Sequence, residues 1–96
     1  MSEINVEKPD KAKIKQLEIP DSPQNTGQWS IWECEPSTFD WEYDDTEVCY
    51  IYEGDVTVKT PNSQTHIKAG DLVTFPKGLK CIWEVKDKIK KVYKFE

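Results

Sequence analysis

From Trp29 to the C-terminus, the sequence is divided into short runs rich in β-branched and aromatic residues, each followed by turn-forming residues. This alternation is typical of an all-β sandwich or barrel. The runs lie at 29–33, 39–43, 47–52, 55–60, 65–68, 71–75, 80–85 and 91–95. Glycine, proline or asparagine marks tight turns at 53–55, 61–63 and 69–71. We therefore expect an all-β fold of six to eight strands.

The first 28 residues follow a different pattern and predict an N-terminal arm. Ile4 and Val6 favour a short edge strand, and Asp10 is placed to cap a helical turn or two that ends near Leu17. The polar stretch 20–27 contains two prolines and a glycine, which favour an exposed loop. A chain of 96 residues has room for one core. The expected organisation is thus an arm at 1–28 and a barrel at 29–96.

Charge and cysteine content exclude several classes of protein. Acidic residues outnumber basic ones by 18 to 13, and the lysines are scattered, so the basic footprint that nucleic acid requires is missing. The N-terminus has no apolar core of the kind that a secretory leader contains, and no stretch of about 18 apolar residues predicts a membrane span. Cys34, Cys49 and Cys81 form no CxxC pair, and their odd number argues against a disulfide framework. We expect a cytoplasmic protein with no nucleic-acid or membrane partner.

The segment from Gly70 to Cys81, GDLVTFPKGLKC, carries a recognisable pattern. Gly70 opens a strand from a turn, while Pro76 and Gly78 make the corner before the next strand. The segment resembles the second motif of the cupin superfamily, also called RmlC-like. That motif runs Gly, five residues, Pro, one residue, Gly, two residues and then a metal-binding His. In this chain Cys81 stands at the position of the His.

The first cupin motif, two histidines one residue apart followed by a glutamate and a glycine, can be aligned on 41–54. Glu47 then occupies the position of the glutamate, and Trp41 and Tyr43 occupy those of the histidines. The runs 47–54, 75–78 and 81–83 are similar to small single-domain cupins related to ureidoglycine aminohydrolase and the ethanolamine-utilisation cupin. The resemblance implies a jelly-roll-like cupin barrel in which Trp41, Tyr43, Glu47 and Cys81 face one mouth.

The residues at the four metal-ligand positions of the two motifs indicate whether a metal is expected. Trp41 cannot bind a metal, and a neutral Tyr43 is a poor ligand, so only Glu47 and Cys81 remain as donors. We therefore expect no tightly held metal and no other cofactor; a metal, if bound, would use these two residues. The structural interpretation of Cys81 is a small buried apolar residue. His66, the only histidine, lies between the motifs and away from any ligand position.

Glu47 is the candidate catalytic residue. A carboxylate among aromatic side chains must be paired, protonated or hydrated, because burying it alone costs several kcal/mol. Desolvation would raise its pKa and suit it to acid-base chemistry or to holding a ligand. Glu47 hydrogen-bonded to Tyr43 or to the backbone, with no further role, is the structural alternative.

The aromatic residues complete the predicted ligand site. With Glu47 and Cys81, the candidate ligand-binding residues are Trp41, Tyr43, Phe75 and Trp83, whose rings would stack on a small molecule or fill the core. Tyr50, Tyr52, Trp29 and Trp32 are expected to point outward and to form a homodimer face.

Three functions follow from these expectations. The leading one is a metal-independent cupin that binds a small polar metabolite, with acid-base chemistry at Glu47. The second is a metal-dependent, aminohydrolase-like enzyme, and the third is a structural or interaction domain whose barrel is filled.

Overall fold

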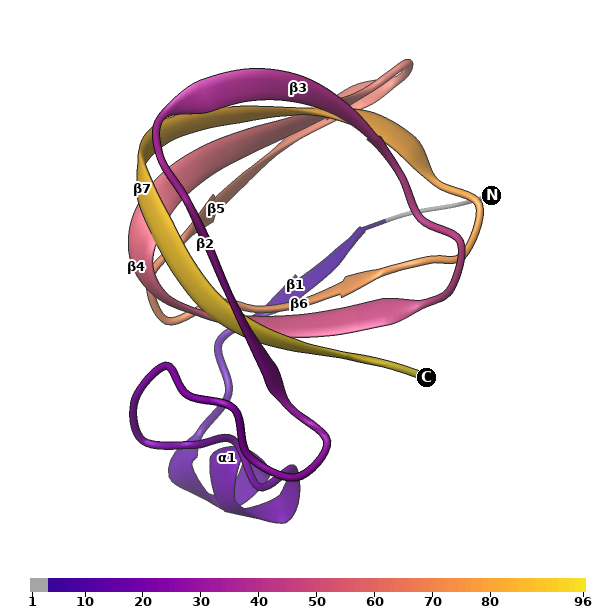
Figure 1. The fold of residues 1–96 in the computed structure, drawn as a ribbon. Coiled ribbons are helices and arrows are strands. Elements are labelled where there is room, and N and C mark those ends of the chain that lie inside the picture. The colour runs from indigo at the N-terminus through magenta and orange to yellow at the C-terminus, as the bar shows by residue number, and fades with distance from the viewer. Residues whose placement is uncertain (1–3) are drawn as a thin grey trace.

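The computed structural model describes residues 4–96, which form one folded antiparallel sheet and a short helix. The elements in chain order are β1 (Asn5–Glu7), α1 (Lys11–Gln16), β2 (Ser30–Cys34), β3 (Ser37–Glu42), β4 (Glu47–Thr60), β5 (Ser63–Lys68), β6 (Leu72–Phe75) and β7 (Lys80–Phe95). The strand order is β1-β6-β4-β7-β2, with β3 also paired to β7 and β5 to β4. The strands curve around a common interior with α1 below them, so the predicted all-β barrel is confirmed (Figure 1).

Two strands are longer than the sequence predicted. β4 continues through 53–55, where a tight turn was expected, and β7 runs unbroken from Lys80 to Phe95. Gly54 has a φ of 115°, and the pairing register shifts three times between Ile51 and Val56. The prediction of a turn is therefore wrong: the glycine forms a bulge that bends a continuous strand. The turns expected at 61–63 and 69–71 are confirmed.

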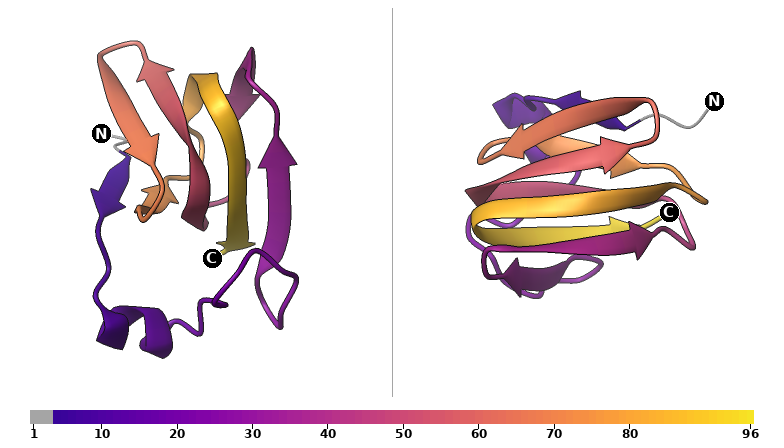
Figure 2. Two further views of the ribbon diagram at one scale, coloured as in Figure 1. Left: turned by 90° about the vertical axis from the view of Figure 1, so that its left-hand side faces the viewer. Right: turned by 90° about the horizontal axis from the view of Figure 1, so that it is seen from above.

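The bend in β4 lets one strand serve two parts of the barrel. Its first half pairs with β6 and with the second half of β7, and its second half pairs with β5 and the first half of β7. β7 is divided in the same way, because β3 pairs with Lys80–Val85 and β2 with Ile89–Tyr93. Both views in Figure 2 show β4 and β7 side by side along the barrel wall.

The beginning of the N-terminal arm is attached to the barrel. β1 pairs with the edge of β6, and the Lys8 ammonium lies 2.7 Å from Asp71. Asp10 caps α1 as predicted, since its carboxylate accepts a hydrogen bond of 2.8 Å from the backbone N–H of Lys13. Residues 1–3 of the predicted arm lie outside the described residues.

A second, smaller core lies between the arm and the outside of the barrel. Its buried members are Ile19, Trp29, Val48, Leu72 and Val92, with Tyr50 and Tyr52 packed against them. Trp29 donates from its indole to the carbonyl of Leu17, and Tyr52 donates to that of Pro20. Trp29 therefore cannot contribute to the expected dimer face, because the arm buries it, whereas Tyr50 and Tyr52 are half-buried and a homodimer face at these two residues stays a prediction.

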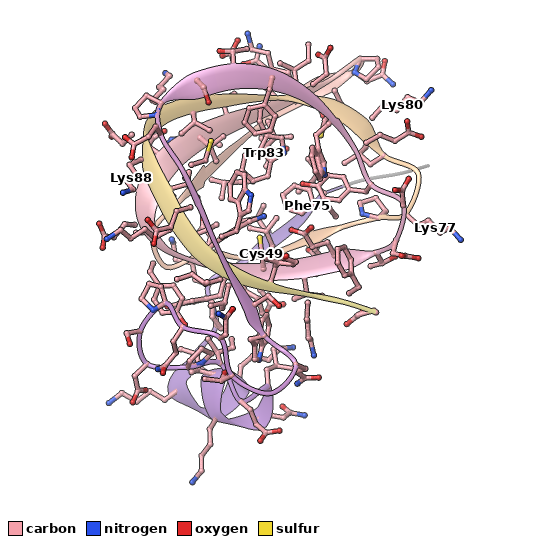
Figure 3. All side chains as sticks on the ribbon, in the orientation of Figure 1. Cys49, Phe75, Lys77, Lys80, Trp83 and Lys88 are labelled. Atoms are coloured by element: carbon pink, nitrogen blue, oxygen red, sulfur yellow. The ribbon has the colours of Figure 1, made fainter. Side chains whose placement is uncertain are left out.

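The main core fills much of the barrel interior. Inward and outward side chains alternate along the strands, as the two-residue period of a strand requires. Figure 3 shows Cys49, Phe75 and Trp83 inside the ring of strands, while Lys77 and Lys88 point away from it. No helix within residues 4–96 is long and apolar enough to cross a membrane.

Candidate ligand pocket

A pocket of about 280 Å³ lies inside the barrel between β2, β3, β4 and β7. Two of its lining residues are charged and the remainder are aromatic: Trp32, Phe39, Trp41, Tyr43, Glu47, Trp83, Lys91, Tyr93 and Phe95. Ligand sites are typically apolar cavities with a few polar groups that fix the orientation of the ligand. The volume suits a small molecule rather than a peptide.

Aromatic rings form the walls of the pocket as a continuous set of contacts. Trp83 lies edge-on to Trp32 at 5.8 Å and nearly parallel to Phe39 at 6.1 Å. Trp41 meets Tyr43 edge-on at 6.3 Å, and 49% of its surface is exposed. Phe95, at 58%, is also exposed. Trp41 and Phe95 therefore stand where the pocket meets solvent, and Trp83 forms its inner wall.

The corner of the second motif positions Tyr43. The backbone N–H of Tyr43 donates to Leu79 at 2.9 Å, and its carbonyl accepts from Gly78 at 2.7 Å. Its ring stacks on Phe75, with centroids 4.6 Å apart and planes 7° from parallel. Burial, and secondarily the charge of Glu47, raises the pKa of the Tyr43 phenol far above its usual value. The phenol thus remains a neutral group beside the pocket.

Glu47 is buried and paired with a lysine. Its Oε2 accepts a hydrogen bond of 2.8 Å from the Lys91 Nζ, and each side chain is only 7% exposed. Of the three expected states for this carboxylate, paired, protonated or hydrated, the pairing is the one that the structure contains. A buried pair of opposite charges offers one strong donor and one strong acceptor at a single place in the pocket.

Strand geometry explains why Lys91 points inward. Inward-facing residues alternate along the second half of β7, where Ile89 is buried in the main core and Tyr93 lines the pocket. Lys91 pairs in register with Trp32 on β2, so both side chains stand on the same face. The Nζ lies 4.9 Å from the ring centres of Trp32 and Trp83 and 5.6 Å from that of Tyr93. These distances are within the range of cation–π attraction.

Lys91 was not among the residues predicted for the site. Its position offered one signal, namely that it shares a strand face with Ile89, Tyr93 and Phe95, which are all apolar or aromatic. The neighbouring Lys90 and the many other lysines of this chain made a solvent-exposed interpretation equally natural from the sequence. Only the barrel closure shows that this face of β7 is the interior.

The structure brings together four of the six predicted ligand-binding residues. Trp41, Tyr43, Glu47 and Trp83 line the pocket, and Trp32 joins them although an outward position was expected. Phe75 supports Tyr43 from behind. Cys81 is buried in the main core and does not line the pocket, and burial raises the pKa of its thiol to about 11.

Two further polar side chains, Trp83 and His66, lie in different surroundings. The indole N–H of Trp83 is buried without a hydrogen-bond partner among the described residues. It lies near the Tyr43 phenol and the Cys81 thiol and lowers the pKa of each, against the larger raising effect of burial. His66 instead pairs with Asp55 at 2.8 Å on the exposed β4–β5 hairpin. His66 therefore lies outside the pocket.

The donor set does not fit the metal that the motif resemblance implies. Two positions that would hold histidines carry Trp41 and Tyr43, and the third carries the core residue Cys81. The remaining donor, Glu47, is already engaged by the Lys91 ammonium. Within residues 4–96, no three His, Cys, Asp or Glu side chains gather at one place. In this chain the partner of Glu47 is therefore a lysine cation.

Comparison with known proteins identifies the type of domain. The sequence profile described as "EutQ-like cupin domain" matches residues 21–93. A DUF861 family protein of Thermotoga maritima is 45% identical, with a TM-score of 0.88 over 98% of this chain and 100% of that one. No curated protein matched this sequence.

Two EutQ structures are similar over part of their length. The Clostridium difficile EutQ protein is 25% identical, with a TM-score of 0.64 over 70% of this chain and 54% of that one. A putative ethanolamine utilization protein Q of Salmonella typhimurium, 22% identical, shares the fold with a TM-score of 0.62 over 68% of this chain and 53% of that one. This chain thus spans about half the length of each EutQ chain.

Proposed function

This chain belongs to the EutQ-like cupin domain family, and we propose that it binds a small polar metabolite in the aromatic pocket without using a metal ion. The observation that carries the proposal is the Lys91–Glu47 pair at 2.8 Å inside a pocket of about 280 Å³. The proposal concerns this domain alone, since the EutQ chains are about twice as long.

Stability alone does not explain such a pair. Replacing a buried ion pair with apolar residues of similar size is often neutral or stabilising, because desolvation of the two charges offsets their attraction. A barrel that served only as a scaffold would gain by filling this space with apolar side chains. Retaining the ammonium and the carboxylate among aromatic walls is better explained by a ligand that both groups contact.

Glu47 is also the residue proposed for acid-base chemistry. Its carboxylate and the neutral phenol of Tyr43 both line the pocket, so a bound molecule would meet a proton acceptor beside a neutral hydrogen-bond donor. We propose proton transfer at Glu47 as a step that follows ligand binding. Neither the metal-dependent nor the filled-barrel alternative has a comparable observation in its favour, given the donor set and the open pocket.

A thermal-shift screen of small metabolites, performed in chelator, tests this function. The wild type is compared with a double variant, Lys91→Met with Glu47→Leu, which removes both charges while retaining bulk. A ligand at about 100 times its dissociation constant adds about 2.7 kcal/mol to the free energy of unfolding. We expect stabilisation of the wild type only. Stabilisation that needs added metal, or that is equal in both proteins, would contradict the proposal.

We also propose that the protein is a cytoplasmic homodimer. A dimer is supported by the limited core of a 96-residue domain and by the exposed apolar side chains Ile82 and Phe95. A reducing compartment is supported by the free cysteines Cys34, Cys49 and Cys81. Light scattering at micromolar concentration measures the mass directly. A dimer mass is expected, and a monomer would refute this part of the proposal.

A further inference from the structure

The charge balance of the pocket defines the chemistry of its ligand. Among the residues that the structure describes, Glu47 and Lys91 are the only charged ones that line it, so the formal charge of this lining is zero. An anionic ligand would place a second negative charge beside Glu47, and a cationic one would place a second positive charge beside Lys91. Like charges repel strongly where water is excluded. The lining therefore selects a molecule without net charge.

The aromatic walls add a second restriction. Aromatic boxes commonly bind ligand cations, but the rings of Trp32, Trp83 and Tyr93 already surround the Lys91 ammonium at 4.9–5.6 Å. The position for a cation is thus occupied by the protein itself. The ring faces that remain, including those of Trp41 and Phe95, suit a flat molecule.

The hydrogen bonds of the pair add a third restriction. One of the three N–H donors of Lys91 is used by Glu47, and one carboxylate oxygen of Glu47 is used by Lys91. Neither head group is hydrogen-bonded to any other residue in the described part of the chain. A ligand can therefore accept a hydrogen bond from the ammonium and donate one to the carboxylate at the same time.

We propose that the pocket recognises a small planar lactam, an uncharged ring in which a carbonyl oxygen lies next to a ring N–H. The carbonyl accepts from Lys91, the ring N–H donates to Glu47, and the ring stacks between the aromatic walls. A zwitterion would match the two charges, but it would bring two more ions out of water at several kcal/mol each. The inference rests on the proposed binding function and names its ligand class.

NMR titration with four ring compounds of similar size tests the inference. The probes are 2-pyridone (a neutral lactam), benzoate (an anion), N-methylpyridinium (a cation) and toluene (neutral and apolar), all in chelator. The readout is the indole N–H signals of Trp32, Trp41 and Trp83. Trp29 is the internal control, because its indole is hydrogen-bonded to Leu17 outside the barrel.

We expect 2-pyridone to shift the three pocket signals, leave that of Trp29 unchanged, and bind at least about tenfold tighter than the other probes. This preference is about what one hydrogen bond to a charged group contributes. Tighter binding of benzoate, N-methylpyridinium or toluene at the same indoles overturns the lactam inference and leaves the binding function intact. No shift with any probe up to its solubility limit overturns both.

Variants separate recognition from folding. Lys91→Met is expected to weaken 2-pyridone binding by about tenfold or more. Because this variant leaves the Glu47 carboxylate unpaired and can unfold, the double variant Lys91→Met with Glu47→Leu is the second test. It should fold and lose the preference for 2-pyridone over toluene. Lys86→Met, an exposed lysine on the same strand, is the matched control and should bind normally. Unchanged preference in the double variant overturns the inference.

Discussion

The Nζ of Lys91 lies 2.8 Å from the Oε2 of Glu47, and both side chains are 93% shielded from solvent inside an aromatic pocket. The pairing satisfies a carboxylate that the family pattern reserves for a metal ion. It also neutralises the only charges with which the described residues line the pocket, and the proposed ligand class rests on that neutrality.

Breaking the pair from one side should be far more harmful than removing it altogether. Lys91→Met is expected to lower the free energy of unfolding by about 3–5 kcal/mol, because Glu47 is left charged and buried. The double variant Lys91→Met with Glu47→Leu should equal the wild type or exceed it by about 1–4 kcal/mol. Urea denaturation measures both, with Lys86→Met as the control. A single variant as stable as the wild type would mean that the pair does not form.

Metal content should be low and unimportant for folding. Trp41 and Tyr43 replace two nitrogen donors, and Lys91 already engages Glu47. We expect protein purified without chelator to contain well under one equivalent of transition metal per chain, and its melting temperature to be unchanged in chelator. Elemental analysis and calorimetry provide the two measurements. One tightly bound equivalent would show that other donors complete a site.

The bulge in β4 should depend on glycine. A Cβ at Gly54, where φ is 115°, would lie 2.6 Å from the side chain of Ile89 and 2.6 Å from the carbonyl of Lys88. Gly54→Ala should therefore destabilise the fold by about 2–5 kcal/mol, combining backbone strain with overpacking. Gly78→Ala is the control: its φ is 87° but its Cβ meets nothing within 4 Å, so strain alone should cost about 1–2 kcal/mol. Equal losses by thermal denaturation would contradict the packing at Gly54.

Alkaline pH should weaken the fold partly through Cys49. Burial raises the pKa of this thiol from 9.0 to about 12, so above pH 9 the folded chain retains a proton that the unfolded chain releases. Its contribution is complete below pH 9 and is lost as pH rises from 9 toward 12. Between pH 8 and 10 the loss from this group should be about 1.4 kcal/mol.

Cys49→Ala isolates that contribution. The variant should start at lower stability, since it leaves a cavity, but it should decline less steeply with pH than the wild type. Denaturant unfolding at pH 8, 9 and 10 supplies the two slopes. Parallel slopes would show that Cys49 ionises as readily in the folded barrel as in the unfolded chain.

The sequence predicted most of the fold because the relevant signals are local. The capping Asp10, the turn at Gly70 and the corner at Pro76 each act within a few residues, and each has the predicted role. Gly54 was misinterpreted because a positive φ serves a turn and a bulge equally well, and only the pairing across β7 distinguishes them.

The site was predicted only in part because it depends on contacts between distant strands. Glu47 was identified from its motif position, but its partner Lys91 lies 44 residues away and resembles the exposed lysines around it. Trp29 and Trp32 were both expected outside, yet the arm buries the first and barrel closure turns the second inward. A local sequence pattern does not predict how a sheet closes into a barrel or which residues an N-terminal arm covers.

The most direct test of the account is to capture the ligand from a mixture of small molecules. Wild type and the double variant Lys91→Met with Glu47→Leu are incubated with a small-molecule extract in chelator, washed, and denatured, and the released compounds are compared by mass spectrometry. We predict one uncharged small compound that is enriched near stoichiometrically on the wild type and missing from the variant. Equal recovery from both proteins, or no enriched compound at all, would contradict a binding role for the Lys91–Glu47 pocket.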